Sequence, residues 1–270
     1  MNKRYIGAVI YLIPVLLMLF LGGDILKYGL MICSLIAMWE VFNAFKHKGF
    51  SPVSYIAYAV CVIYYIGIDY FYSDANYLLG LIIAITVLGL IATVIEYEKY
   101  KTIDSIIGIF AFIYCGILLS FIFLISNKQY GQLWIWLIFI LSWSCDVCAY
   151  YFGVNFGKKK IAPIVSPKKS LEGSIAGLLG SVICSTLFGF ILMKIGLIST
   201  VSIYNFVIIG ILGGVMTQFG DLTASSLKRY VGIKDFGNIF PGHGGILDRF
   251  DSIIFATIVV YYYVSIFMGL

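Results

Sequence analysis

Nine apolar runs of about 17 to 23 residues, separated by polar breaks, constrain this chain more than any other feature. A helical run of that length crosses the hydrocarbon layer of a bilayer. The sequence is 61% hydrophobic and 11% charged, and a soluble chain of 270 residues could not hide so much apolar surface in one core. Helices are required, because unpaired backbone groups in lipid are costly and the alternating pattern of a β-barrel is absent. The sequence therefore predicts an all-α, polytopic integral membrane protein.

The polar breaks predict nine membrane-spanning helices. Their approximate ranges are 5–21, 28–45, 55–71, 77–95, 103–125, 133–152, 174–193, 203–224 and 252–270. The first run follows Lys3 and Arg4, as in a secretory signal peptide, but it lacks a small-residue cleavage site and many spans follow it. We therefore expect it to be retained as the first helix.

The basic residues give an independent test of this number of spans. If the amino terminus is cytoplasmic, only Lys27, Lys128 and Lys194 fall on the outer side, which leaves fifteen of the eighteen Lys and Arg residues on the cytoplasmic side. This asymmetry is the positive-inside bias, and an error of one span would destroy it. We therefore expect a cytoplasmic amino terminus and two long cytoplasmic loops, 153–173 and 225–251.

The segment 225–251 is the densest polar stretch of the chain. It carries four cations, three carboxylates and five glycines. Cations bind phosphate, carboxylates bind metal ions, and glycines let the backbone approach a ligand closely. The segment therefore predicts a site for a phosphorylated substrate. The first five spans contain few ionisable residues, so we expect residues 1–130 to form a scaffold and residues 131–270 to form the catalytic region.

Four aspartates lie in or beside the later spans. Asp146 falls in the sixth span and Asp221 near the cytoplasmic end of the eighth, while Asp248 and Asp251 begin the ninth and share a helix face. Ionisable residues in membrane spans are costly and usually functional. A few carboxylates together with substrate phosphates form the usual Mg²⁺ site. The alternative is that these aspartates pair with nearby cations and only hold helices together.

The basic loop 153–173 contains two different patterns. Its lysine run, 158–160, is typical of a topogenic cluster attracted to anionic lipid headgroups. Ser166, Lys168 and Lys169 stand just before a glycine-rich helix start, which suits phosphate capture. The segment 153–158 lacks the spacing of a Walker A motif, which disfavours an ATPase.

Several other motifs carry weaker signals. Gly173 and Gly177 form a GxxxG pattern that indicates close helix packing. Cys145 and Cys148 form a CxxC pair that supplies too few ligands for a zinc site. His243, within a glycine-rich segment, could act as a general base or hydrogen-bond a phosphate.

Two further acidic residues, Glu40 and Asp69, lie within or beside early spans. They have no phosphate-binding neighbours in the sequence. We expect them to pack helices or to reach the membrane interface.

The polar segment closely resembles the signature of the phosphatidate cytidylyltransferases, also called CDP-diacylglycerol synthases. The matching positions read Ser225-x-Leu227-Lys228-Arg229-x4-Lys234-Asp235-x-Gly237-x2-Phe240-Pro241-x-His243-Gly244-Gly245-Ile246-x-Asp248-Arg249-Phe250-Asp251. Two weaker features precede it, Ser166-Pro167-Lys168-Lys169-Ser170-x-Glu172-Gly173 and Gly220-Asp221-Leu222. The family usually has Thr in place of Ser170, a change that keeps the hydroxyl. The resemblance runs from about Asp146 to Asp251, and the first five spans match only in general character.

The resemblance implies a Mg²⁺-dependent reaction of CTP with phosphatidate that yields CDP-diacylglycerol and pyrophosphate. It implies a multi-pass protein of the cytoplasmic (inner) membrane with its active site on the cytoplasmic face. A homodimer is expected by the same resemblance, and no nucleic-acid partner is expected.

The resemblance also distributes roles among the residues. The expected metal ligands are Asp221 and Asp248, supported by Asp251 and Asp146. The expected catalytic residues are Asp221, Asp248, Lys228, Arg229 and His243. The expected substrate-binding residues are Ser166, Lys168, Lys169, Ser225, Lys234 and Arg249.

Two rival functions remain open from the sequence. A CTP-using polyprenol or phytol kinase shares the general plan, but the intact signature favours the cytidylyltransferase. A cation transporter could use the membrane aspartates, but the dense Lys and Arg residues of the last loop would repel a cation.

Overall fold

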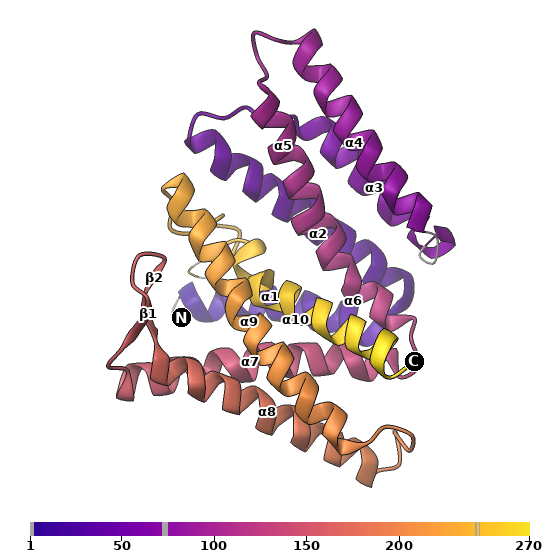
Figure 1. The fold of residues 1–270 in the computed structure, drawn as a ribbon, viewed down its shortest axis with the longest axis vertical. Helices are drawn as coiled ribbons and strands as arrows, with labels where there is room; N and C mark the ends of the chain where they lie inside the picture. The colour runs from indigo at the N-terminus through magenta and orange to yellow at the C-terminus, as the bar shows by residue number, and fades with distance from the viewer. Residues whose placement is uncertain (1–2, 72–74, 241, 243) are drawn as a thin grey trace. The chain divides into compact units, whose positions relative to one another are not determined.

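The computed structural model describes residues 3–71, 75–240, 242 and 244–270. In these ranges the chain forms nine continuous helices and one two-stranded hairpin (Figure 1). The elements are α1 (Lys3–Leu21), α2 (Gly23–His47), α3 (Ser54–Phe71), α4 (Ala75–Ile95), α5 (Thr102–Ala111), η1 (Phe112–Ile117), α6 (Leu118–Ser126), α7 (Gly131–Phe156), β1 (Lys160–Ala162), β2 (Ser166–Ser170), α8 (Leu171–Lys194), α9 (Ile203–Val231), α10 (Leu247–Tyr262) and η2 (Tyr263–Phe267). The π-helical turn η1 joins α5 to α6 without a break, and η2 directly continues α10.

The lengths of these helices confirm an all-α polytopic membrane protein. Among the described residues, seven helices are long and apolar enough to cross a membrane. The other two, α1 and α3, contain shorter apolar stretches, Tyr11–Leu21 and Ser54–Asp69. A helix occurs at each of the nine expected places, and within the described residues seven of them are both long and apolar enough to be spans.

Both polar loops are shorter than the sequence indicated. α9 continues to Val231 and α10 begins at Leu247, so most of the signature cations and carboxylates stand on helices. The other loop contains an antiparallel hairpin in which Lys160 pairs with Ser170. Hydropathy detects where a chain leaves the lipid, but Leu, Lys and Arg are good helix formers and extend α9 beyond that point.

The chain divides into two compact units, of which the first comprises Met1–Leu124 and Tyr230–Arg249. Buried polar contacts join its helices: the hydroxyls of Ser34 and Tyr65 lie 2.8 Å apart, as do those of Tyr64 and Ser120. Asp69 of α3 forms an ion pair with Lys27 of α2, as expected for a helix-packing residue. Interhelical polar contacts of this kind hold helices together where lipid provides no hydrophobic driving force between them.

The second unit comprises Ile125–Arg229 and Phe250–Leu270. α7 and α8 lie side by side, joined by the β1–β2 hairpin (Figure 1). A Cβ atom added at Gly177 would lie 2.9 Å from the Cys145 carbonyl oxygen, so the GxxxG pattern does serve close packing. Further along α8, the Ser181 and Ser185 hydroxyls donate to carbonyls of α9 at 3.0 and 2.9 Å. These contacts hold α9 in a defined position against the α7–α8 pair.

Candidate active site

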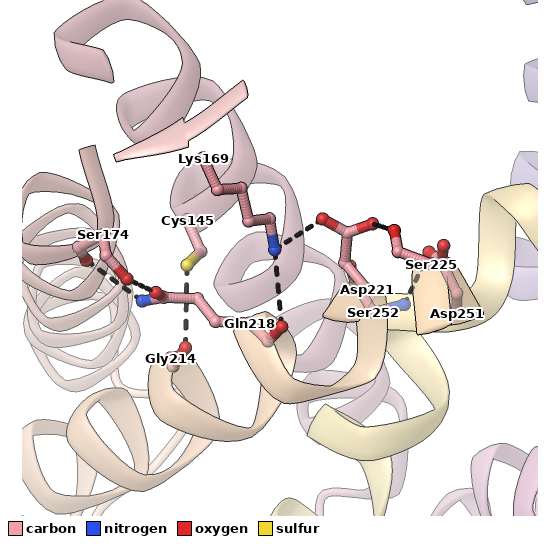
Figure 2. Close-up of polar contacts among 9 residues, drawn as sticks. All are labelled: Cys145, Lys169, Ser174, Gly214, Gln218, Asp221, Ser225, Asp251 and Ser252. Atoms are coloured by element: carbon pink, nitrogen blue, oxygen red, sulfur yellow. Dashed lines mark hydrogen bonds and ion pairs between the residues drawn. The ribbon is translucent and has the colours of Figure 1, made fainter. Parts of the chain in front are cut away.

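An ion pair between Lys169 and Asp221 is the centre of the polar cluster in the second unit. The Lys169 side chain extends from β2, and its Nζ lies 2.5 Å from an Asp221 carboxylate oxygen on α9 (Figure 2). The same Nζ donates to the Gln218 carbonyl oxygen at 3.4 Å. Both side chains of the ion pair are about one-quarter to one-third exposed, at 26% and 31%. The pair therefore lies at the edge of the protein, within reach of a ligand.

Two further signature residues lie beside this ion pair. The Ser225 hydroxyl, one helical turn after Asp221 on α9, donates to its carboxylate at 3.4 Å. Asp251 on α10 is 7% exposed and accepts a 2.7 Å hydrogen bond from the Ser252 backbone N–H. In Figure 2 the Ser225 hydroxyl is drawn between the carboxylates of Asp221 and Asp251.

Electrostatic contacts extend the cluster to α7. The Asp251 carboxylate is repelled by the negative charges of Asp221 and Asp146 and attracted by the positive charge of Lys228. α9 and α10 approach closely at Gly220, where an added Cβ would lie 2.4 Å from the Asp251 carbonyl oxygen. The fold thus brings three of the four predicted metal-binding aspartates, and two predicted phosphate-binding lysines, into one part of the second unit.

Gln218 is a member of this cluster that the sequence did not single out. Its Nε2 donates to the Ser174 carbonyl oxygen at 3.0 Å, and its Oε1 accepts from the Ser174 hydroxyl. Gln218 thereby ties α9 to the start of α8, one turn before Asp221. An amide within an apolar span was the signal that could have revealed it.

The hairpin that carries Lys169 is fixed at both ends. Ser170 caps α8 by accepting a 3.2 Å hydrogen bond from the Gly173 N–H. The Glu172 carboxylate accepts from the backbone N–H groups of Lys158 and Lys159, at 3.0 and 3.3 Å. Arg229 Nε donates to the Val165 carbonyl at 3.4 Å. The hairpin therefore presents Lys169 from a braced backbone.

Neighbouring predicted residues differ in exposure. Lys169 is partly buried, whereas Lys168, next to it on β2, is exposed; Ser166 is partly buried. Lys158, Lys159, Lys160, Lys234, Asp146 and Arg229 are also exposed. The structure thus brings Lys169 to the carboxylates and leaves Lys168 on the surface.

The signature loop, defined here as residues 232–246, belongs to the first unit. Asp248, the second residue of α10, binds back to it: its Oδ2 accepts from the backbone N–H groups of Phe236 and Gly245, at 2.8 and 3.0 Å. Phe240 N–H donates to the Gly244 carbonyl at 3.0 Å. Asp248 therefore braces the loop from within. His243 lies outside the described residues.

Arg249 has a donor that finds no partner in the described parts of the chain. Its Nε is buried, yet it makes no hydrogen bond to any described residue. An unsatisfied buried donor costs free energy, and an anion would satisfy it. This observation fits the predicted role of Arg249 in binding phosphate.

The carboxylates of the cluster are candidate ligands for a metal ion. Among the described residues, no group of three or more His, Cys, Asp and Glu side chains is arranged to hold a metal ion. Mg²⁺, however, takes oxygen ligands and is held by one or two carboxylates together with substrate phosphates and water. The carboxylate oxygens of Asp221 and Asp251 are suitable ligands for a Mg²⁺ ion that is also held by substrate phosphates. The described residues do not form a metal site from protein ligands alone.

The chain is similar to known proteins over nearly its whole length. Residues 2–267 match the family model described as the cytidylyltransferase family. The chain belongs to the cytidylyltransferase family. It is 34% identical over 255 residues to a phosphatidate cytidylyltransferase of Staphylococcus saprophyticus subsp. saprophyticus, covering 94% of this chain and 95% of the relative. It is 31% identical over 272 residues to the phosphatidate cytidylyltransferase of Bacillus subtilis, covering 99% and 98%.

A relative in Staphylococcus aureus (strain COL), also named phosphatidate cytidylyltransferase, is 33% identical over 258 residues, which are 94% of this chain and 95% of the relative. The sequence similarity of this cytidylyltransferase to its relatives therefore extends over α1 to α6. The signature lies outside these helices, and from the sequence alone they resembled the family only in general character. The family assignment and the full-length coverage confirm the identification that the signature gave.

Proposed function

We propose that the chain transfers the cytidylyl group of CTP to phosphatidate, giving CDP-diacylglycerol and pyrophosphate in phospholipid synthesis. The observation that carries this function is the full-length match to relatives named phosphatidate cytidylyltransferase. In the reaction a phosphate oxygen of phosphatidate attacks the α-phosphorus of CTP, and the bond to pyrophosphate breaks.

The chemical difficulty of this reaction is charge. The phosphomonoester is already anionic near neutral pH, so a strong general base is not needed. Repulsion between this anion and the triphosphate opposes attack, and fixed cations that neutralise and align the two groups lower the barrier. The Lys169–Asp221 pair and Lys228 supply cations beside carboxylates in one cluster. Binding of phosphate would draw Lys169 from its carboxylate partner toward the substrate.

We assign the metal to the aspartates. Asp221 and Asp251 would hold Mg²⁺, with Asp146 as a supporting ligand, and Asp248 is included because it belongs to the same signature. When bound, the metal would neutralise triphosphate charge and orient the phosphates. Asp251 is kept in place by the Ser252 N–H and Asp221 by Ser225 and Lys169.

The remaining signature residues complete the proposal. The substrate phosphates are assigned to Ser166, Lys168, Lys169, Ser225, Lys228, Arg229, Lys234 and Arg249, and His243 to a hydrogen bond with phosphate or a proton transfer. Residues 131–270 would supply most of these groups, with residues 1–130 as their support. The proposal also includes nine spans, a cytoplasmic amino terminus and active site in the inner membrane, and a homodimer.

Nucleotide selectivity provides the first test. Purified protein in phosphatidate-containing micelles with Mg²⁺ should convert CTP, and not ATP, GTP or UTP, into a nucleoside-diphosphate lipid and pyrophosphate. Radiolabelled phosphatidate and thin-layer chromatography identify the lipid, and a coupled assay measures pyrophosphate. A phosphorylated alcohol with CDP would show the rival lipid kinase instead. Ion flux in proteoliposomes without nucleotide turnover would show a transporter.

Topology provides the second test. A cysteine introduced at Ser166 or at Asn238, which is exposed in the signature loop, should react with a membrane-impermeant thiol reagent only when the cytoplasmic face is accessible. Inverted vesicles should label and intact cells should not. The unsubstituted protein is the control for its six natural cysteines. Labelling of either position in intact cells would overturn the proposed orientation.

A further inference from the structure

The signature loop is held by a carboxylate from a distant part of the chain, Glu40 of α2. Glu40 is fully buried, with 0% of its surface exposed. Its Oε1 accepts a 2.9 Å hydrogen bond from the Ile246 N–H, and its Oε2 accepts a 2.8 Å bond from the Leu247 N–H. Both oxygens thus bind backbone donors more than 200 residues away, at the junction of the loop and α10.

These two donors explain why a carboxylate is suited to this place. Leu247 is the first residue of α10, and the first N–H groups of a helix have no partner inside it. The amino-terminal end of a helix also favours negative charge. Glu40 therefore caps α10 from another helix, and the hydrogen bonds are charge-assisted. A buried carboxylate is otherwise costly, so its position is closely tied to these donors.

Two glycines of the signature make room for this carboxylate. A Cβ added at Gly245 would lie 2.0 Å from Glu40 Oε1, and one added at Gly237 would lie 2.5 Å from the same atom. Neither distance is compatible with a side chain unless the carboxylate moves. A side chain at either signature position would therefore displace the Glu40 carboxylate.

The loop is consequently fixed by two carboxylates. Glu40 binds the N–H groups of Ile246 and Leu247, while Asp248 binds those of Phe236 and Gly245. Both carboxylates also lie against Gly245. Its N–H donates to Asp248, and a Cβ added to it would collide with Glu40. Movement of Glu40 would therefore change the direction in which α10 starts, and with it the placement of Asp248 and Arg249.

We propose that Glu40 is a positioning residue for cytidylyl transfer: it fixes the start of α10 and so orients Asp248 and Arg249. This inference rests on the proposed function. Glu40 does not touch substrate in this role; it acts through the backbone of the signature loop. Helix α2 of the first unit thereby takes a direct part in shaping the signature.

The test compares two buried carboxylates of the first unit. Asp104 on α5 is 2% exposed and also accepts two backbone N–H bonds, from Ser51 at 2.7 Å and Lys101 at 2.8 Å, outside the signature loop. Glu40→Gln replaces one acceptor oxygen with an NH₂ group that faces an N–H donor. Asp104→Asn makes the same change at the matched site. Both variants should lose thermal stability.

Only Glu40→Gln should lose catalytic activity. In folded protein we expect its kcat to fall by about tenfold to a hundredfold with little change in KM for phosphatidate, since misplacement of catalytic groups by about 1 Å has effects of this size. Asp104→Asn should keep the wild-type kcat. A kcat for Glu40→Gln near the wild-type value, or an equal loss in both variants, would overturn the proposal.

A substrate-free measurement separates this inference from the proposed function. Hydrogen–deuterium exchange of the peptide covering residues 244–249 should be faster in Glu40→Gln than in wild type and unchanged in Asp104→Asn. If the wild-type protein makes no CDP-diacylglycerol, the proposed function is wrong. The exchange measurement still tests whether Glu40 fixes the start of α10. Unchanged exchange in Glu40→Gln would show that Glu40 does not fix the loop.

A second variant is available if Glu40→Gln does not fold. Gly245→Ala should push the carboxylate from its donors without changing any charge, and should lower kcat and speed exchange in the same peptide. Gly80→Ala is its control, because a Cβ at Gly80 meets nothing within 4 Å. Wild-type kcat and exchange in Gly245→Ala would contradict the proposal.

Discussion

Replacing Asp221 with asparagine is expected to lower the rate of CDP-diacylglycerol formation on the order of 10³-fold, in protein that remains folded and inserted in the membrane. Asparagine keeps the size of the side chain but removes the charge that a hard cation needs. The change also releases Lys169, which forms a 2.5 Å ion pair with Asp221. The measurement is the initial rate with saturating CTP and phosphatidate over a series of Mg²⁺ concentrations.

Asp69→Asn is the matched control for this loss of charge. Asp69 also forms an ion pair with a lysine, Lys27, but in the first unit and outside the signature. Its removal should affect stability and leave the rate close to that of wild type. Substantial Mg²⁺-dependent activity in Asp221→Asn, with normal expression, would contradict the assignment of Asp221 as a metal ligand.

The signature also predicts how Asp248 combines with Asp221. Asp248→Asn should reduce activity to a similar degree, because we propose that both carboxylates serve one metal-dependent step. Residues that act as a unit are strongly non-additive, so the double variant should be scarcely slower than either single variant. A double variant whose losses multiply would show that the two aspartates act independently. Asp248 would then contribute through its hydrogen bonds to Phe236 and Gly245.

Removal of the clustered lysines is expected to have the second largest effect. Lys169→Ala and Lys228→Ala should each lower kcat/KM for CTP on the order of 10²-fold, because each removes a fixed cation from a site that must neutralise phosphate charge. Lys168→Ala, at the exposed neighbour of Lys169, is measured in the same series. Each variant is assayed at several CTP concentrations to separate kcat from KM.

Lys159→Ala is the control for these cationic residues. The Lys159 side chain is exposed, and its described contact with Glu172 uses the backbone N–H, which alanine retains. Its removal should change only the charge at the membrane surface. If all of these lysine-to-alanine variants show equally small losses of kcat/KM, the 166–170 segment is a topogenic cluster and not a phosphate-binding site.

The membrane class, the helices and the family were predictable from local sequence. Apolar runs fix helices because lipid leaves the backbone no other partners, and the positions of all nine helices followed from this rule. The β1–β2 hairpin and the extension of α9 to Val231 were not predicted, because polarity alone does not distinguish a loop from a helix or strand outside the lipid.

The contacts of the candidate site were only partly predictable. Asp221, Asp251 and Lys169 stood out as charges near membrane spans, yet their sequence positions could not show that Lys169 pairs with Asp221. That pairing depends on how α8 and α9 pack, through Ser174 and Gln218 and through small residues along both helices. Such packing is a property of the three-dimensional fold.

Glu40 shows most clearly what the sequence determines and what only the tertiary structure determines. The sequence by itself determined the membrane-embedded class, the cytidylyltransferase signature and its glycines, because local composition and spacing carry that information. It left Glu40 as a helix-packing or interfacial residue, since its partners Ile246 and Leu247 are more than 200 positions away. Only the tertiary structure decided that its carboxylate caps α10 and that Gly237 and Gly245 make room for it. The physical reason is that a buried charge is stabilised by whichever donors the fold brings to it, and separation along the chain does not reveal them.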